Sequence, residues 1–120
     1  MKLHTNCEIG HDKSITELEN DFDAIFLGIG STKSNEVKIE GEKSSNVHFA
    51  IDFLTGIQKR NLGSKNVSYI DVTDKKVVVI GGGDTAMDCV RTSVREGAIS
   101  VKCLYRRDEA NMPGSKKEVV

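Results

Sequence analysis

Apolar and polar positions follow two different periods along this chain, and the changes of period divide its C-terminal part into strands and a helix. Residues 76–80 form a short, nearly continuous apolar run that is typical of a buried strand. Residues 84–97 carry small or apolar side chains at helical spacing, and residues 99–105 alternate again as a strand does. This order predicts a βαβ unit, whose crossover is right-handed in nearly all known cases. Gly97 lies where the helix is expected to end in a left-handed C-cap.

The first part of the chain predicts shorter elements. Residues 3–10 indicate a short strand and turn. Ser14 and Glu17 have the spacing of a capping box, which predicts a short helix through residue 20. Residues 23–27 are apolar after Asp23 and precede glycines, so they predict a strand with a glycine-rich exit.

Between these parts the sequence predicts an exposed connection and a helix. Residues 31–46 are rich in Ser, Lys, Asn and Glu, with a short strand expected at 37–39. Asn46 is expected to cap a helix that ends within residues 61–66, and residues 67–71 indicate an edge strand. The apolar positions of this helix are Phe49, Ala50, Phe53, Leu54 and Ile57.

The turn between residues 80 and 84 carries the strongest chemical signal. Gly81-x-Gly83-x-x-Ala86 is the spacing of a dinucleotide-binding loop in its Ala-ending form. Gly81 allows a tight turn, Gly83 lets a pyrophosphate approach the backbone, and Ala86 lets the helix lie close to the sheet. The free N–H groups and the positive end of the helix dipole favour phosphate there. The predicted cofactor-binding residues of the loop are Gly81, Gly82, Gly83, Asp84, Thr85 and Ala86.

Asp84 needs a separate interpretation, because a carboxylate that faced a pyrophosphate would repel it. At a helix start the same side chain caps backbone N–H groups, and Thr85 is placed to help. We therefore predict a structural role for Asp84.

The end of the second predicted strand bears on the choice of dinucleotide. Sites for NAD place Asp or Glu about 20 residues after the glycines to bind the ribose 2′-OH. Arg106 and Arg107 stand there instead, and a guanidinium pairs with a phosphate through two parallel hydrogen bonds. These arginines predict NADP over NAD, with Tyr105 available to stack on the adenine. The alternative is that both arginines are solvated charges at a strand end.

Composition narrows the class of protein. The chain has 120 residues, of which 38% are hydrophobic, and a net charge of −1. A nearly balanced charge gives no broad attraction to nucleic acid or to anionic membranes. No apolar run approaches the roughly 20 residues of a membrane span, and no signal-peptide core is present. We expect a soluble, cytoplasmic protein with neither nucleic acid nor membrane as partner.

The remaining reactive side chains predict neither a metal site nor a catalytic group. Cys7, Cys89 and Cys103 form no C-x-x-C pair, which argues against metal ligation and a disulfide framework. Cys89 and Cys103 are expected to be small buried hydrophobes, and the histidines are expected at the surface. We predict no catalytic residue and no metal.

Several of these motifs closely resemble the family of the small (beta) subunit of NADPH-dependent glutamate synthase and its flavoprotein relatives, within the pyridine nucleotide-disulfide oxidoreductase-like proteins. The resemblance covers nearly the whole chain. It is carried by residues 22–30, 41–42, 47–54, 77–92, 105–109 and 111–115.

The resemblance implies an oxidoreductase with FAD and NADPH as cofactors. Family members bind both on two nested dinucleotide-binding domains and pass electrons from NADPH through FAD and iron–sulfur clusters to a large subunit, which makes glutamate. It implies that residues 81–86 form the NADPH phosphate loop and that Arg106 and Arg107 bind the 2′-phosphate. The expected partners are a nicotinamide dinucleotide, the missing flavoprotein halves or a glutamate synthase large subunit.

The expected fold is α/β, a Rossmann-like three-layer βαβ NAD(P)-binding unit after a partial FAD-domain segment. Residues 1–35 are the partial FAD-domain segment, 36–75 a connecting region with one helix, and 76–120 a truncated NADPH-binding unit. The family's first glycine-rich FAD motif has no counterpart before residue 22. Ser115 and Glu118 have capping-box spacing after Pro113-Gly114, which predicts a helix start close to the end of the sequence.

Two functional interpretations follow from different classes. The chain is the NADPH-binding portion of a glutamate synthase small-subunit-type flavin oxidoreductase, or it is a non-catalytic gene fragment or isolated nucleotide-binding module without its own activity. Because the first FAD motif is missing, we expect the isolated chain to bind NADP(H) weakly or not at all and to lack diaphorase activity.

Overall fold

The computed structural model of the protein describes residues 1–31, 33–34, 36–115 and 117. The chain divides into two compact units, Met1–Ser31 and Thr32–Val120. Each unit is described by itself.

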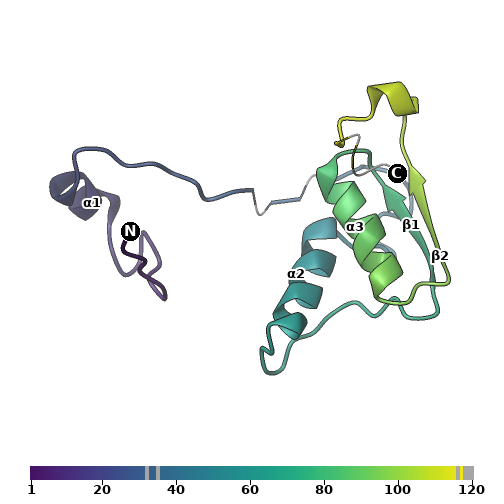
Figure 1. Cartoon of the computed structure of the whole chain (residues 1–120), viewed down its shortest axis with the longest axis horizontal. Helices are drawn as coiled ribbons and strands as arrows, with labels where there is room; N and C mark the ends of the chain where they lie inside the picture. The colour runs from purple at the N-terminus through teal and green to yellow at the C-terminus, as the bar shows by residue number, and fades with distance from the viewer. Residues whose placement is uncertain (32, 35, 116, 118–120) are drawn as a thin grey trace. The chain divides into compact units, whose positions relative to one another are not determined.

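The first unit contains helix α1, Ile15–Asp21 (Figure 1). The predicted capping box is present, because the Ser14 N–H donates to Glu17 Oε2 at 2.8 Å and the Glu17 N–H donates to Ser14 Oγ at 3.1 Å. Lys13 and Asp21 bridge the ends of the helix through a 2.7 Å ion pair. The predicted short helix is therefore confirmed, and its start is determined by local side-chain hydrogen bonds.

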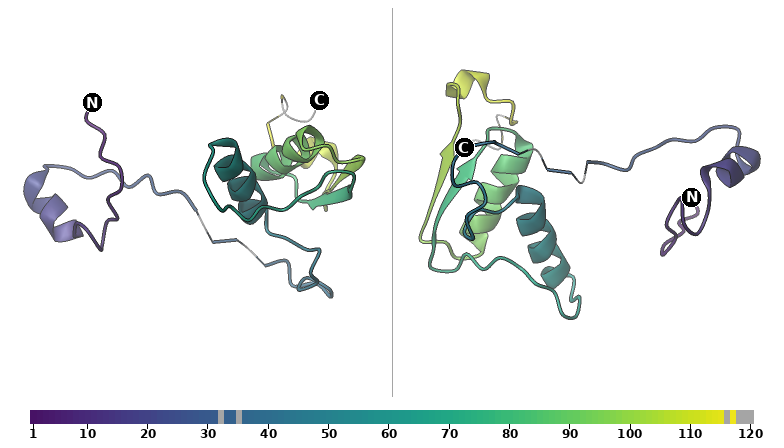
Figure 2. Two further views of the ribbon diagram at one scale, coloured as in Figure 1. Left: turned by 90° about the horizontal axis from the view of Figure 1, so that it is seen from below. Right: turned by 180° about the vertical axis from the view of Figure 1, so that it is seen from behind.

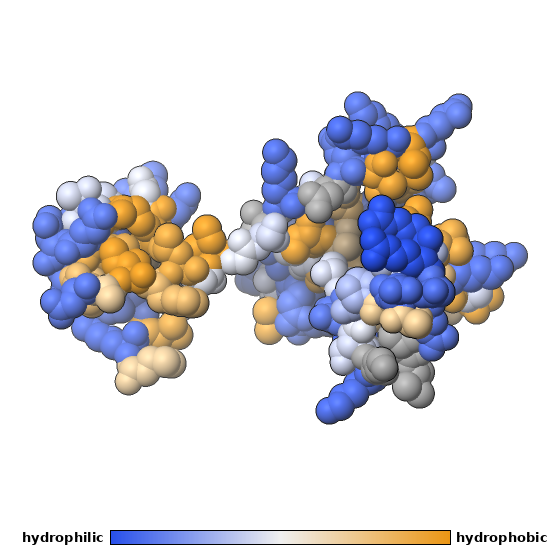
Figure 3. Space-filling view, turned by 90° about the horizontal axis from the view of Figure 1, so that it is seen from above, coloured by the Kyte–Doolittle hydropathy of each residue, from blue (hydrophilic) through white to orange (hydrophobic). Residues whose placement is uncertain are grey.

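The strands predicted in this unit are absent from its described residues. Residues 3–8 are irregular, and a turn at residues 10–12 joins the single bridge between Ile9 and Lys13. Residues 23–27 have no paired neighbour. A strand exists only when another strand satisfies its N–H and C=O groups. The apolar side chains that were expected to enter a sheet lie at the surface, and Phe26 is 95% exposed. Figure 3 shows hydrophobic side chains on the surface of this unit.

The second unit holds the predicted βαβ order and the glycine turn. Strands β1 and β2 pair in parallel, from Lys76↔Ser100 to Ile80↔Leu104, and α3 forms the crossover between them (Figures 1 and 2). The elements of this unit are α2 (Ala50–Asn61), β1 (Lys76–Ile80), α3 (Asp84–Arg95), β2 (Ser100–Leu104) and the 3₁₀ helix η1 (Glu109–Asn111).

Both long helices of the second unit lie on the same face of the sheet. Phe53 and Ile57 of α2 and Cys89 of α3 form the core with Val72, and Val77 and Val79 of β1 pack against it. The side chains of the other sheet face, Val78, Ile80 and Leu104, are 55%, 60% and 54% exposed. The described residues therefore form two layers, and the expected third layer is not seen among them.

The C-terminal end predicted for α3 is confirmed, whereas the N-cap predicted for α2 is wrong. Gly97 follows the C-cap of α3 with φ of +84°, and the Ala98 N–H donates to the Ser93 carbonyl at 3.1 Å, so the left-handed cap is confirmed. Asn46 does not cap α2. The helix begins after Phe49, whose carbonyl accepts from the N–H groups of the first turn.

The short strands predicted at 37–39 and 67–71 are also wrong. The N–H groups of Val37 and Lys38 donate to the Glu42 carboxylate at 2.7 and 3.0 Å, so a nearby side chain takes the place of a neighbouring strand. Residues 67–71 run against α2, where a Cβ on Gly56 would lie 3.2 Å from the Tyr69 backbone. Close packing on a helix therefore determines their course.

The helix start predicted at residues 115–118 includes Lys116 and Glu118, which lie outside the described residues. No described helix has the length and apolar character needed to cross a membrane.

Candidate nucleotide-binding site

The turn after β1 brings the sheet and α3 into close contact. Gly81 has φ of +148°, a conformation that favours glycine, and its N–H donates to the Leu104 carbonyl at 2.9 Å. A Cβ on Gly81 would lie 3.2 Å from the Cβ of Ala86. The tight turn and the small side chain predicted at these positions are what the geometry requires.

A row of backbone donors follows the turn. Within the described part of the chain, the N–H groups of Gly82, Gly83, Asp84 and Thr85 donate no hydrogen bond. A Cβ added to Gly83 would meet nothing within 4 Å, so the backbone there borders open space. Free N–H groups at a helix start bind anions well, because the helix dipole adds positive charge. The loop can therefore hold a phosphate.

Asp84 does not cap the helix, contrary to our prediction. The N-cap residue is Gly83, which has no side-chain cap, and Asp84 is the first residue of α3. The Asp84 Oδ1 atom accepts a hydrogen bond of 2.8 Å from the Ser115 N–H. The Asp84 carboxylate therefore accepts a hydrogen bond from a segment distant in sequence, and not from the N–H groups of its own helix.

Residues 105–115, which we call the clasp segment, fold back over the glycine turn. The Tyr105 ring packs on Gly82, where an added Cβ would lie 2.6 Å from the ring carbon Cδ2. The Gly114 N–H donates to the Gly82 carbonyl at 2.9 Å, and the Tyr105 hydroxyl donates to the Asn111 carbonyl at 3.2 Å. The sequence indicates a helix start after Pro113-Gly114. These two residues also allow a sharp turn, but the sequence does not show that this turn contacts Gly82.

Within this segment, η1 has its own cap. Asp108 Oδ1 accepts from the Asn111 N–H at 3.0 Å and from the Asn111 side-chain amide at 2.6 Å. These bonds determine how the chain reverses between β2 and Gly114.

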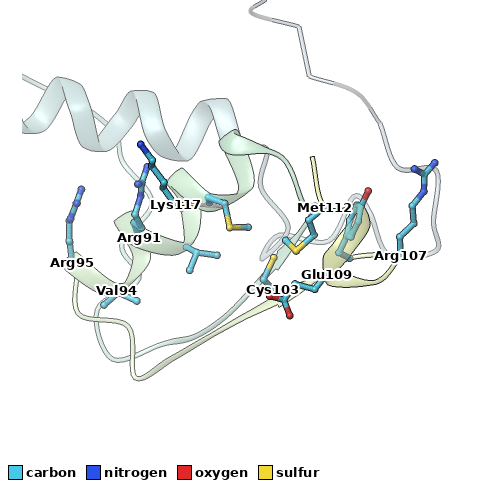
Figure 4. A pocket seen from close by; sticks show the side chains of 11 residues that line it. Arg91, Val94, Arg95, Cys103, Arg107, Glu109, Met112 and Lys117 are labelled. Atoms are coloured by element: carbon cyan, nitrogen blue, oxygen red, sulfur yellow. The ribbon is translucent and has the colours of Figure 1, made fainter. Parts of the chain in front are cut away.

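The two predicted phosphate-binding arginines follow β2 directly, and both are exposed. Arg107 lines a groove of about 770 Å³ that runs along α3 and β2. In Figure 4, Arg95 lies toward one end of this groove and Arg107 toward the other. Because Gly81 is hydrogen-bonded to the last residue of β2, the arginines lie shortly after the strand end that contacts the loop.

Of the three cysteines, Cys89 is buried, and Cys7 and Cys103 are exposed. Cys89 is buried as predicted, and burial followed by the charge of Asp88 raises the pKa of its thiol to about 11. Cys103 is exposed, so the expectation of burial was wrong there. Its side chain points from β2 to the loop, and its thiol donates to the Gly81 carbonyl at 3.1 Å.

His4, His11 and His48 are exposed, as expected. Among the described residues, no group of three or more His, Cys, Asp or Glu side chains is placed to hold a metal ion.

A parallel βαβ unit with a glycine turn between its first strand and its helix places this chain among the α/β proteins. The chain belongs to the pyridine nucleotide-disulphide oxidoreductase family, whose model matches residues 3–119. It is 48% identical over 122 residues to the glutamate synthase [NADPH] small chain of Escherichia coli strain K12, an alignment that covers 99% of this chain and 26% of that protein.

Other relatives have similar identities. The glutamate synthase [NADPH] small chain of Azospirillum brasilense is 48% identical, with 97% of this chain and 25% of that protein covered. The putative oxidoreductase AegA of Escherichia coli is 48% identical, with 99% and 19% covered. The resemblance inferred from the motifs is confirmed, and the chain spans about a quarter of the length of the first two relatives.

Proposed function

We propose that this chain is the NADPH-binding portion of a glutamate synthase small-subunit-type flavin oxidoreductase, which passes electrons from NADPH through FAD toward glutamate synthesis. The observation that supports it most directly is the row of N–H groups from Gly82 to Thr85 at the start of α3, which donate no hydrogen bond among the residues that the structure describes. The similarity to proteins named glutamate synthase [NADPH] small chain supports the choice of reaction.

The residues present fit the phosphate groups of a dinucleotide. The N–H groups of the loop would receive the pyrophosphate on the open side of Gly83. Arg106 and Arg107 would pair with the 2′-phosphate of NADP, because their planar, permanently charged heads match its oxygens. In this proposal the chain binds and orients the dinucleotide. NADPH itself supplies the hydride.

The flavin side of the proposal rests on the resemblance of residues 22–30. These residues are extended in the first unit, with Gly30 at φ of +68°.

A second candidate is an isolated nucleotide-binding module without activity of its own. The observation that favours it is the separate core of the second unit, which α2, α3 and β1 complete with Val72. A unit with its own core can bind a dinucleotide whether or not a flavin is nearby. Mixing the purified chain with FAD and NADPH separates the two candidates. NADPH oxidation that depends on FAD supports the first, and binding without oxidation supports the second.

The binding claim is tested by titrating the full chain with NADPH and with NADH while the backbone amide signals are followed by NMR, which also measures weak binding. We expect the largest shifts at residues 82–85, and tighter binding of NADPH. The variant Arg106→Ala/Arg107→Ala should bind both dinucleotides equally. Lys59→Ala/Lys65→Ala, which removes the same charge elsewhere, should keep the preference.

Two results would contradict the proposal. The first is an absence of amide shifts in the loop at millimolar concentrations of either dinucleotide. The second is a preference for NADPH that survives the loss of both arginines, which would remove them from the site.

A further inference from the structure

The Asp84 carboxylate lies at the start of α3, beside the donors that would hold a pyrophosphate. The carboxylate and a phosphate are both negatively charged, so they repel each other when they lie close together. The carboxylate nevertheless has a partner. Ser115 donates its backbone N–H to Asp84 Oδ1 at 2.8 Å, across 31 positions of sequence.

Neighbouring contacts fix this partner in place. Gly114 is buried, its N–H donates to the Gly82 carbonyl at 2.9 Å, and an added Cβ there would lie 3.0 Å from that oxygen. On the other side of the turn, the Tyr105 ring packs directly on Gly82. The clasp segment is thus attached to the glycine turn at both of its ends.

We propose that Asp84 and Ser115 are positioning residues, in that the Ser115 N–H holds the Asp84 carboxylate away from the phosphate-binding N–H groups of the loop. This inference rests on the proposed function, because it assigns a role in binding the same dinucleotide. A hydrogen bond to an ionised carboxylate is one of the stronger kinds in proteins. Loss of the donor releases the carboxylate toward the anion, and loss of the carboxylate charge makes the donor dispensable.

The test compares the dissociation constants for NADPH of the full-length wild-type chain, Ser115→Pro, Asp84→Asn and the double variant. Ser115→Pro removes the backbone N–H donor together with the hydroxyl and fixes the φ angle of residue 115, and it should weaken binding about tenfold at low salt. The loss should shrink at higher salt, since ions screen the repulsion. Asp84→Asn keeps an oxygen acceptor without the charge, and it should restore binding to Ser115→Pro within about twofold.

Matched controls separate charge from structure. Asp88→Asn removes a charge one turn further along α3 and should not restore binding to Ser115→Pro. Ser115→Ala keeps the N–H and separates the loss of that donor from the loss of the hydroxyl. If the role is only structural, the loss of affinity depends neither on salt nor on the charge of Asp84. A loss that is unchanged at higher salt, or one that Asp84→Asn does not reverse, overturns the proposal.

Hydrogen exchange provides a readout that needs no nucleotide and no proline variant. In the wild-type chain the Ser115 amide should exchange slowly, and Asp84→Ala should accelerate it at least about tenfold. If neither dinucleotide binds but this protection is present and depends on Asp84, the proposed function fails and the positioning of the carboxylate is supported. A Ser115 amide that exchanges freely in the wild type overturns the positioning role.

Discussion

Gly81 and Ala86 are matched in size across the turn that joins β1 to α3. A Cβ on Gly81 would lie 3.2 Å from the Cβ of Ala86, closer than side chains ordinarily pack. Gly81 also has φ of +148°, so the turn requires glycine both for its conformation and for its lack of a side chain. The distance between the sheet and the helix is therefore determined by the two smallest residue types.

The variant Gly81→Ala should destabilise the chain by about 1–3 kcal/mol, because it adds a strained conformation to a steric contact. Chemical denaturation followed by circular dichroism measures this change. Gly83→Ala is the matched control, since Gly83 has φ of −92° and open space around its Cα. Its cost should stay below about 1 kcal/mol. Equal losses for the two variants would show that the turn does not constrain Gly81.

The same Gly83→Ala variant should impair binding while leaving the fold intact. Its new Cβ enters the open space that the pyrophosphate is expected to occupy. We expect the dissociation constant for NADPH to rise about tenfold or more, which corresponds to about 1.4 kcal/mol. Titration of the variant against the wild type checks this. Unchanged affinity would mean that the phosphates do not approach at Gly83.

Local sequence signals account for the parts of the fold that were predicted correctly. The capping box of Ser14 and Glu17, the left-handed Gly97 and the βαβ order each depend on residues close together in sequence. Strands expected at 23–27 and 67–71 failed, because a strand also needs a partner that its own pattern does not specify.

In the candidate site, too, only features set by nearby residues could be predicted. The spacing along the sequence predicted the glycine turn and the arginines, and the turn has the expected backbone geometry. The bond between Ser115 and Asp84 could not be predicted, because it depends on how the clasp segment reverses after β2. We predicted that Asp84 caps its own helix, which depends only on neighbouring residues. In the structure its carboxylate accepts from the distant Ser115 N–H.

The thiols of Cys89 and Cys103 should differ sharply in reactivity. Burial raises the pKa of Cys89 to about 11, so this thiol stays protonated at neutral pH, and the thiolate is the reactive form. Cys7 and Cys103 are exposed. At pH 8 a water-soluble thiol reagent should label these two and spare Cys89, as mass spectrometry of the peptides would show. Labelling of Cys89 at the same rate in the folded chain would contradict its burial. In denaturant all should react.

Helix α1 should lose its N-cap at low pH. The hydrogen bonds from the Ser14 backbone N–H and hydroxyl lower the pKa of the Glu17 carboxyl. A lowered folded-state pKa means that the stabilisation is present above the ordinary pKa of glutamate and is lost as the pH falls through the lower, folded-state value. NMR titration of the Ser14 amide should therefore show a transition at a pH below the ordinary pKa of glutamate. Glu17→Gln should abolish it, whereas Glu19→Gln should not. A transition at the ordinary value would contradict the capping geometry.

The attachment of α2 to α3 should depend on the planar Arg60 guanidinium. Its Nη2 atom lies 2.7 Å from both Glu96 oxygens, and its Cζ atom lies 4.7 Å from the centre of the Tyr69 ring. Arg60→Lys keeps the charge but loses this geometry, so it should lower the midpoint of thermal unfolding by a few degrees, and Glu96→Gln should do the same. Because both variants break one interaction, their combination should cost less than the sum. Lys59→Ala, on the same turn of α2, serves as the control for charge alone. Strict additivity would show that the pair contributes nothing to the docking of the helices.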